Sequence, residues 1–183
     1  MKVLIVGNGG REHALAWKLK KDDPTIDLHL APGNGGTPQI ATNHPVKADD
    51  IQSLLNLAER ELFDLTIVGP ELPLTQGIVD RFEERGLPIF GPSRKAARIE
   101  GSKVYAKEFM RNNGIPTAEF YVENEPYHAM MSGLRILNKF GKGVVKADGL
   151  AGGKGSIIYK NEDELQTALQ QIIIDIRFYH QFE

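Results

Sequence analysis

The chain has 183 residues, of which 41% are hydrophobic and 25% charged, and its formal net charge is −2. This balance provides no basic field for nucleic acid, so no nucleic-acid partner is expected. Cysteine is absent, which excludes disulfides, thiolate metal sites and a cysteine nucleophile, and which fits a cytoplasmic location. No apolar run approaches the roughly 20 residues that span a bilayer, so no membrane partner is expected either.

The first half of the chain alternates short apolar runs with helical patterns. The apolar runs predict strands over residues 3–6, 26–30, 64–68 and 87–90. Helical spacing of apolar residues predicts helices over residues 11–20, 50–61 and 77–85. This alternation favours a parallel sheet with helices on both faces. We therefore expect a Rossmann-like α/β domain over residues 1–100.

The second half has a different pattern. Helices are expected over residues 94–99, 103–112, 127–139 and 162–174, with an extended segment over 118–122. Two strands are expected over residues 143–147 and 156–159, on either side of a glycine-rich loop. The domain boundary is placed near residues 92–102, and a second domain then covers residues 101–183.

The first glycine cluster, Gly7-Asn8-Gly9-Gly10, follows a strand and opens a helix. Backbone N–H groups at such a place favour an anion, which predicts binding of a phosphate or a sugar phosphate. The dinucleotide-binding fingerprint has a third glycine where Glu12 stands, and no acidic residue closes the second strand, so NAD is disfavoured. The alternative is a tight turn that binds no ligand.

Glu71 follows Gly69-Pro70 at the end of the third apolar run. In an open α/β sheet, ligands collect at the carboxyl ends of the strands. A carboxylate at that edge accepts hydrogen bonds from sugar hydroxyls or an amine. The alternative, a solvated glutamate in a turn, is equally compatible with the sequence.

The loop over residues 149–155 joins two predicted strands and is rich in glycine. It is not a Walker A motif, because Gly149 is three residues from Gly153-Lys154 and a strand follows where a helix is needed. Lys146 lies in an apolar strand, where an ammonium favours an anionic partner, and Lys154 lies at the tip of the loop. The pattern predicts a lid over the phosphates of ATP. The alternative is a solvent-exposed hairpin with two ordinary lysines.

Four of the five histidines show no metal-ligand spacing. They are expected to be isolated surface residues: His29, His44, His128 and His180.

Four stretches in order resemble the phosphoribosylamine–glycine ligase (glycinamide ribonucleotide synthetase) family of ATP-grasp enzymes. They are KVLIVGNGGREHALAWKL with APGNGG, then VGPELPLTQGIVDRF, then IFGPSRKAARIEGSKVYAKEFMRNNGIPTA, and last VVKADGLAGGKG. The resemblance runs almost continuously from Lys2 to about Gly155. It implies a Rossmann-like N-terminal (pre-ATP-grasp) domain, followed by a partial ATP-grasp domain.

The resemblance also implies an activity of purine biosynthesis. ATP would phosphorylate the carboxylate of glycine, and 5-phosphoribosylamine would attack the acyl phosphate to give glycinamide ribonucleotide, ADP and phosphate. The implied small-molecule partners are ATP, glycine and 5-phosphoribosylamine, with Mg²⁺ as the metal. The alternative function is that of a non-catalytic module that binds nucleotides or sugar phosphates.

The family's roles carry over to matching positions of this chain. ATP would be bound by a first group: Lys103, Lys146, Gly149, Gly152, Gly153, Lys154, Gly155 and Ser156. Phosphoribosylamine would be bound by a second group: Gly7, Asn8, Gly9, Gly10 and Glu71. No catalytic residue and no metal ligand is assigned within the chain.

Two features depart from the family pattern. Gly152 replaces the second alanine of the usual AAGKG flap, which loosens the flap without removing its function. Family members are also more than twice as long, and their Mg²⁺ ligands lie in the C-terminal portion beyond this chain. That portion is therefore an expected partner, and the isolated chain is expected to lack ligase activity.

Overall fold

The computed structural model describes residues 1–150 and 155–179. The chain divides into two compact units, Met1–Arg98 and Ile99–Glu183. Within the described part of the chain, no helix is both long and apolar enough to cross a membrane.

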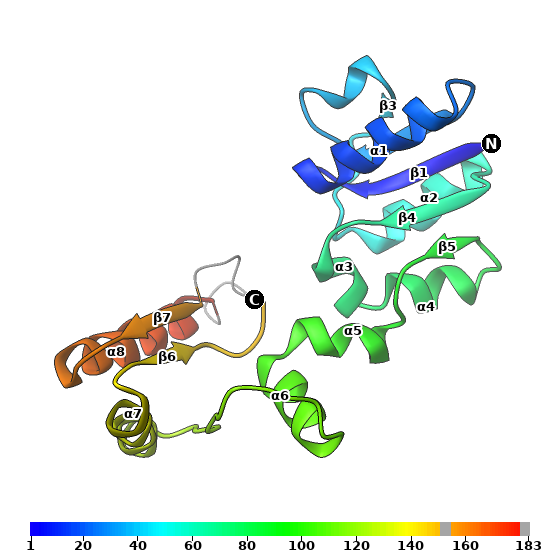
Figure 1. Ribbon diagram of the computed structural model, residues 1–183. Coiled ribbons are helices and arrows are strands. Elements are labelled where there is room, and N and C mark those ends of the chain that lie inside the picture. Colours follow the sequence, from blue (N-terminus) through cyan, green and yellow to red (C-terminus); the bar gives the residue numbers. More distant parts are fainter. Residues whose placement is uncertain (151–154, 180–183) are drawn as a thin grey trace. The chain divides into compact units, whose positions relative to one another are not determined.

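The first unit is built on a five-stranded sheet with the strand order β3-β2-β1-β4-β5 (Figure 1). The strands are β1 (Lys2–Gly7), β2 (Asp27–Pro32), β3 (Thr42–Asn43), β4 (Leu65–Val68) and β5 (Ile89–Phe90). Every pair of neighbours is parallel. The predicted parallel, Rossmann-like sheet is therefore confirmed, with β3 as an additional strand that is too short to produce a sequence pattern.

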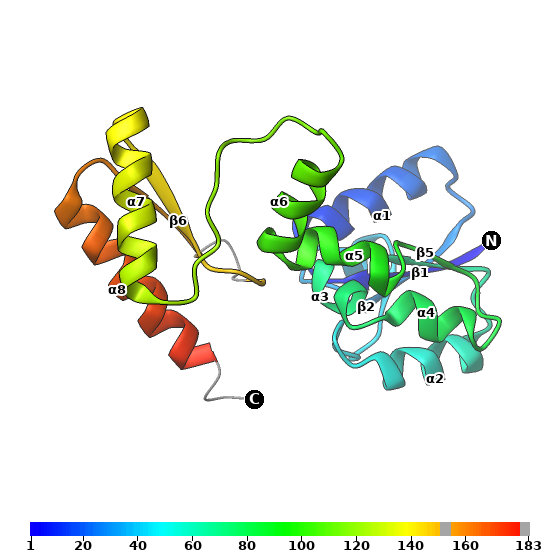
Figure 2. The same cartoon turned by 90° about the horizontal axis from the view of Figure 1, so that it is seen from below.

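Helices lie on both faces of this sheet, as expected (Figure 2). They are α1 (Gly10–Asp22), a 3₁₀ turn (Thr37–Gln39), α2 (Ile51–Glu61), α3 (Glu71–Thr75) and α4 (Ile78–Glu83). Because side chains alternate along a strand, β1 contributes to two cores. Leu4 and Val6 pack with residues of α2 and α4, whereas Val3 and Ile5 pack with Ala16 of α1.

Helix α1 buries an unusual set of residues. Its two buried positions are Glu12 and Ala16, whereas Leu15 and Trp17 are 40% and 52% exposed. A carboxylate therefore occupies the buried start of a helix, where an apolar side chain would be the common choice.

The second unit is a β-hairpin with helices. The hairpin pairs β6 (Gly143–Lys146) with β7 (Ser156–Tyr159) in antiparallel register. The helices are α5 (Arg94–Gly101), which spans the boundary, α6 (Lys103–Asn112), α7 (Pro126–Phe140) and α8 (Glu162–Tyr179). The last helix continues past its predicted end at residue 174, because no glycine or proline follows to stop it.

Two glycines allow this hairpin to pack closely on α7. The ring of Tyr159, which is 2% exposed, lies against Gly143, and its hydroxyl donates a hydrogen bond to the carbonyl of Gly133 at 3.0 Å. Leu165 of α8 in turn lies against Gly133. The core of the second unit therefore depends on small residues opposite large ones.

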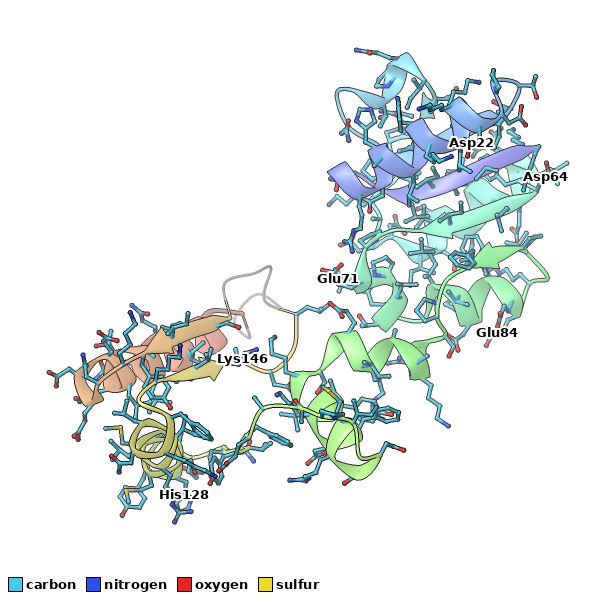
Figure 3. The ribbon with its side chains drawn as sticks, in the orientation of Figure 1. Asp22, Asp64, Glu71, Glu84, His128 and Lys146 are labelled. Atoms are coloured by element: carbon cyan, nitrogen blue, oxygen red, sulfur yellow. The ribbon has the colours of Figure 1, made fainter. Side chains whose placement is uncertain are left out.

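The expectation that the histidines are isolated surface residues is wrong for one pair. His29 is 7% exposed, and its ring stacks on His44 with the Nδ1 atom of His29 2.8 Å from Nε2 of His44. The two residues meet because β2 and β3 are neighbours, which the sequence did not reveal. His128 is exposed on α7 (Figure 3), and His180 lies outside the described residues.

We predict that Gly143→Ala destabilises the second unit by roughly 1–3 kcal/mol, because the added methyl group would overlap the ring of Tyr159. Chemical denaturation measured by circular dichroism tests this. The control is Gly35→Ala, where the added methyl group meets no atom within 4 Å. Equal effects of the two substitutions would contradict the packing argument.

We also predict a loss of stability in acid that depends on His44. Burial and the neighbouring His29 hold the pKa of His44 below its ordinary value, so the unfolded chain takes up this proton more readily. The free energy of unfolding should therefore fall as the pH is lowered through about 6.5.

Denaturant titrations followed by the fluorescence of Trp17, the single tryptophan, measure this dependence. His44→Gln should flatten it, whereas His128→Gln should leave it unchanged. An unaltered pH dependence in His44→Gln would refute the assignment.

Candidate functional site

Three loops of the first unit meet at the carboxyl edge of its sheet. The N–H of Gly33, after β2, donates to the carbonyl of Gly7 at 3.1 Å, and the N–H of Gly69, after β4, donates to the carbonyl of Val6 at 3.0 Å. Asn34 adds a side-chain hydrogen bond to the carbonyl of Asn8 at 3.1 Å. Since β2, β1 and β4 are parallel neighbours, their carboxyl ends necessarily share this edge.

Glu12 fills the centre of this edge. One carboxylate oxygen, Oε2, accepts a hydrogen bond from the N–H of Gly9 at 2.6 Å. A methyl group added to Gly7, Gly9 or Gly69 would overlap the Glu12 side chain. These three glycines therefore make room for a carboxylate that belongs to the protein itself.

The other oxygen of Glu12, Oε1, is buried and has no hydrogen-bond partner among the described residues. The nearest cation is Arg11, whose Nε lies 3.7 Å away, beyond hydrogen-bond length. The side chain of Glu12 is 4% exposed, so this oxygen lies away from bulk solvent.

Glu71 opens α3 at the end of β4, where Figure 3 labels it. Its carboxylate accepts a hydrogen bond from Nη2 of Arg11 at 3.2 Å. The backbone N–H of Glu71 and the guanidinium of Arg11 hold the pKa of this carboxyl group below its ordinary value, so it is ionised at neutral pH. One guanidinium thus lies between two carboxylates.

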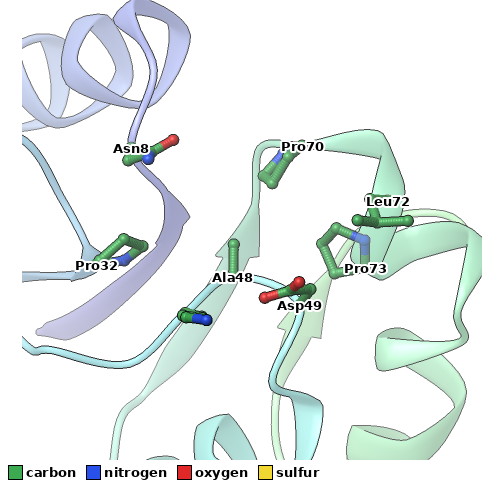
Figure 4. Close-up of a pocket in the computed structure, with 8 residues that line it drawn as sticks. Asn8, Pro32, Ala48, Asp49, Pro70, Leu72 and Pro73 are labelled. Atoms are coloured by element: carbon green, nitrogen blue, oxygen red, sulfur yellow. The ribbon is translucent and has the colours of Figure 1, made fainter. Parts of the chain in front are cut away.

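An open pocket of about 250 Å³ lies at the same edge (Figure 4). Asn8 and Pro70, which follow β1 and β4, line it together with Pro32, the last residue of β2. Lys47 and Asp49 contribute one positive and one negative charge to the lining. The pocket is large enough for part of a sugar phosphate and presents both hydrogen-bonding and apolar groups.

The hairpin of the second unit has one covered face and one exposed face. Tyr159 points to the covered face, which α7 and α8 pack against. The register pairs Val144 with Ile158 and Lys146 with Ser156, so these four side chains share the opposite face. Val144 and Ile158 are 48% and 65% exposed. An apolar surface and a cationic side chain therefore lie side by side.

The ends of the glycine loop are held together. The N–H of Ala147 donates to the carbonyl of Gly155 at 2.9 Å, which extends the hairpin pairing by one step. The loop therefore begins and ends at the edge of the exposed face, next to Lys146 and Ser156.

Asp148 ties the start of this loop to helix α6. Its carboxylate accepts hydrogen bonds from the hydroxyl of Ser102 at 3.0 Å and from the N–H of Val104 at 3.2 Å. Burial disfavours its charge, but the surrounding donors, which are the N–H groups of Val104, Gly149 and Lys103 and the hydroxyl of Ser102, together outweigh burial and hold the pKa of Asp148 below its ordinary value. Ser102 also caps α6 by accepting from the N–H of Tyr105.

Lys103 belongs to the same cluster. Its Nζ donates to the carbonyl of Gly149 at 2.7 Å. An ammonium has three protons, so this bond leaves donors for a further acceptor.

The structure thus groups the sequence-predicted residues into two clusters. Near Glu12 and Arg11 lie Gly7, Asn8, Gly9, Gly10 and Glu71; around the hairpin lie Lys103, Lys146, Gly149, Gly155 and Ser156. Gly152, Gly153 and Lys154 lie outside the described residues.

Sequence reasoning missed two contributors. Glu12 was considered only as a departure from a glycine fingerprint, although its position three residues after Gly9 is that of the acidic partner in a capping box. Asp148 was not considered at all, because its partners lie 44 and 46 residues earlier in the chain.

Sequence models of one family match almost the whole chain. The model described as phosphoribosylglycinamide synthetase, N domain, matches residues 1–100, and that family's ATP-grasp (A) domain model matches residues 101–181. The phosphoribosylamine–glycine ligase of Xanthomonas campestris pv. campestris is 47% identical over 175 residues, which are 94% of this chain and 40% of the relative.

Solved structures agree with the sequence matches. The phosphoribosylamine–glycine ligase of Thermotoga maritima superposes with a TM-score of 0.69 at 36% identity, over 91% of this chain and 38% of that one. A more distant structure, the N5-carboxyaminoimidazole synthase of Aspergillus clavatus, shares the fold with a TM-score of 0.67 at 21% identity, over 93% and 43% of the two chains.

The chain therefore spans about 40% of the length of the curated relatives that it matches. Its parallel sheet and these matches lead to one conclusion: the chain belongs to the phosphoribosylglycinamide synthetase family, with an N domain followed by ATP-grasp sequence.

Proposed function

We propose that this chain forms the N-terminal part of an enzyme that ligates glycine to 5-phosphoribosylamine at the expense of ATP. In this reaction the carboxylate of glycine attacks the terminal phosphoryl group of ATP, which gives an acyl phosphate and ADP. The amine of phosphoribosylamine then attacks the acyl carbon, phosphate leaves, and glycinamide ribonucleotide is formed. The observation that carries the proposal is the match of both family domains over the length of the chain.

The exposed face of the hairpin supports a role in binding ATP. Val144 and Ile158 provide an apolar surface that fits a purine base, and Lys146 on the same face provides a cation for the phosphates. Lys103 and the loop that begins at Gly149 lie together at the end of this face. Fixed cations at this position would neutralise the charge that develops during phosphoryl transfer.

The edge of the sheet in the first unit supports a role in binding phosphoribosylamine. Asn8 lines the open pocket, and the ionised carboxylate of Glu71 accepts hydrogen bonds from hydroxyl or amine groups. Holding the amine in a fixed place relative to the acyl phosphate is the main contribution that such a site makes to the rate.

The family implies Mg²⁺, but the described residues do not fit a resident ion. No group of three or more histidine, aspartate or glutamate side chains in the described part of the chain is arranged to ligate a metal. We therefore assign no step of the reaction to residues of this chain acting through a metal.

The ligation is tested by replacing the corresponding part of the Xanthomonas relative with this chain. The chimaera should release ADP only when glycine and phosphoribosylamine are both present. Tight binding of ATP without any release of ADP would instead support the alternative, a non-catalytic module that binds nucleotides.

For ATP binding, we predict that Lys146→Ala weakens the affinity of the chain about 10- to 100-fold, the usual value of a hydrogen bond to a charged group. Calorimetry with ATP measures the change. Lys160→Ala removes an exposed lysine just beyond the hairpin and should leave the affinity unchanged. Equal losses in the two variants would indicate a general charge effect and contradict the assignment.

For the lid, we predict that Asp148→Ala lowers the affinity for ATP several-fold and destabilises the second unit by about 1 kcal/mol. The substitution removes an acceptor at the start of α6 and leaves the bond from Lys103 to the carbonyl of Gly149 as the remaining side-chain tie between this helix and the start of the loop among the described residues. Asp148→Asn, which keeps one acceptor oxygen, should have a smaller effect on both.

The control is Glu125→Ala, since Glu125 is exposed and its side chain makes no capping bond to α7. Unchanged affinity for ATP in Asp148→Ala would show that the tie between the loop and α6 has no role in nucleotide binding.

A further inference from the structure

The start of α1 is the place where a Rossmann-like domain ordinarily binds a phosphate. In this chain the carboxylate of Glu12 occupies that position. Oε2 of Glu12 accepts the N–H of Gly9 at 2.6 Å, as a phosphate oxygen would, and the glycines of two turns close around the same side chain. We infer that Glu12 is a specificity-determining residue that excludes phosphate from the β1–α1 turn. This turn then receives the hydroxyl or amine end of the substrate.

Space supports this inference. Gly7 and Gly9 of the first turn, and Gly69 of the turn after β4, all contact the Glu12 side chain so closely that a methyl group on any of them would overlap it. Oε1 is buried against Gly69 and has no hydrogen-bond donor within the described parts of the chain. A phosphate group therefore has no room at the N–H of Gly9 unless Glu12 leaves.

Charge supports it independently. Arg11 is the one cation paired with Glu12 and Glu71 in the described structure, so two carboxylates and one guanidinium leave one net negative charge. The positive end of the α1 dipole is offset by the same carboxylate of Glu12. The surroundings therefore repel a dianionic phosphate and favour neutral or basic donors.

The inference fixes the orientation of a sugar phosphate at this edge, and in this respect it rests on the proposed function. The hydroxyl groups and the amine would face Glu71 and the N–H groups of Gly10 and Arg11, which begin the helix and lack partners within it. The phosphate would point away from the β1–α1 turn. The carboxylate of glycine is excluded from the turn for the same reason.

The test measures anion binding at the turn by amide chemical shifts of the isotope-labelled chain, with pyrophosphate as the probe. The native chain should show no saturable shift at Gly9, Gly10 or Arg11. Glu12→Gly removes the charge and opens the space, and it should bind pyrophosphate at least about tenfold more tightly than the native chain. Saturable binding of pyrophosphate at these amides in the native chain would overturn the inference.

Two further variants separate charge from volume and from folding. Glu71→Gln removes one negative charge from an exposed position and should raise the affinity for pyrophosphate much less than Glu12→Gly does. An equal rise in affinity would overturn the inference. If Glu12→Gly fails to fold, Glu12→Ala, a better helix former, removes the charge and most of the volume. A gain in affinity for pyrophosphate then supports the inference, and no gain refutes it.

The result of the pyrophosphate experiment does not depend on whether the second unit binds ATP. Loss of ATP binding at the hairpin would contradict the proposed function, yet it would leave the anion result at the turn unchanged. Conversely, pyrophosphate binding at the native turn would refute the role of Glu12 while ATP binding at the hairpin stands.

Discussion

The burial of β1 on both faces is the constraint on which the first unit depends. An apolar run of four residues, Val3 to Val6, offers no polar face to solvent, so helices must cover both sides. The same strand pairs with β2 and β4 in parallel, which brings the loops after all three strands to one edge. The location of the candidate substrate site is therefore a consequence of packing and of strand direction.

The second unit uses the opposite arrangement. Its hairpin is covered on one face only, with Tyr159 and Leu165 fully enclosed and Val144 and Ile158 exposed. Exposed apolar side chains beside a lysine are costly in water unless something else is to be bound there. A nucleotide is the occupant that we propose for this combination of apolar and cationic groups.

Much of the fold was predictable because it follows from local patterns. The helix over Lys103–Asn112, with Ser102 as its cap, and the strand over Ser156–Tyr159 were predicted with their observed bounds, since caps, glycines and apolar periodicity mark them. The resemblance of several ordered motifs identified the family, which periodicity alone does not do. The glycine turns were recognised as candidate sites for the same local reason.

What could not be predicted depends on contacts between distant residues. The strand β3 is two residues long and exists because β2 is beside it. The pairing of His29 with His44 follows from that contact. The burial of Glu12 requires Gly69, which lies 57 positions later and in another loop, so no pattern around the helix reveals it. Tertiary contacts of this kind override local propensity.

The contact between Glu12 and Gly69 has a consequence for how this sequence can change. Glycine at positions 7, 9 and 69 is commonly explained by the approach of a ligand, but here a side chain of the protein fills the space beside all three, and Gly7 is required in addition by its φ of +131°. These positions are therefore coupled to position 12 as a single unit. A larger residue at 69 becomes compatible with the fold only after the residue at 12 has become shorter. A substitution of Gly9 or Gly69 must therefore follow a change at position 12, whereas position 7 still requires glycine after that change.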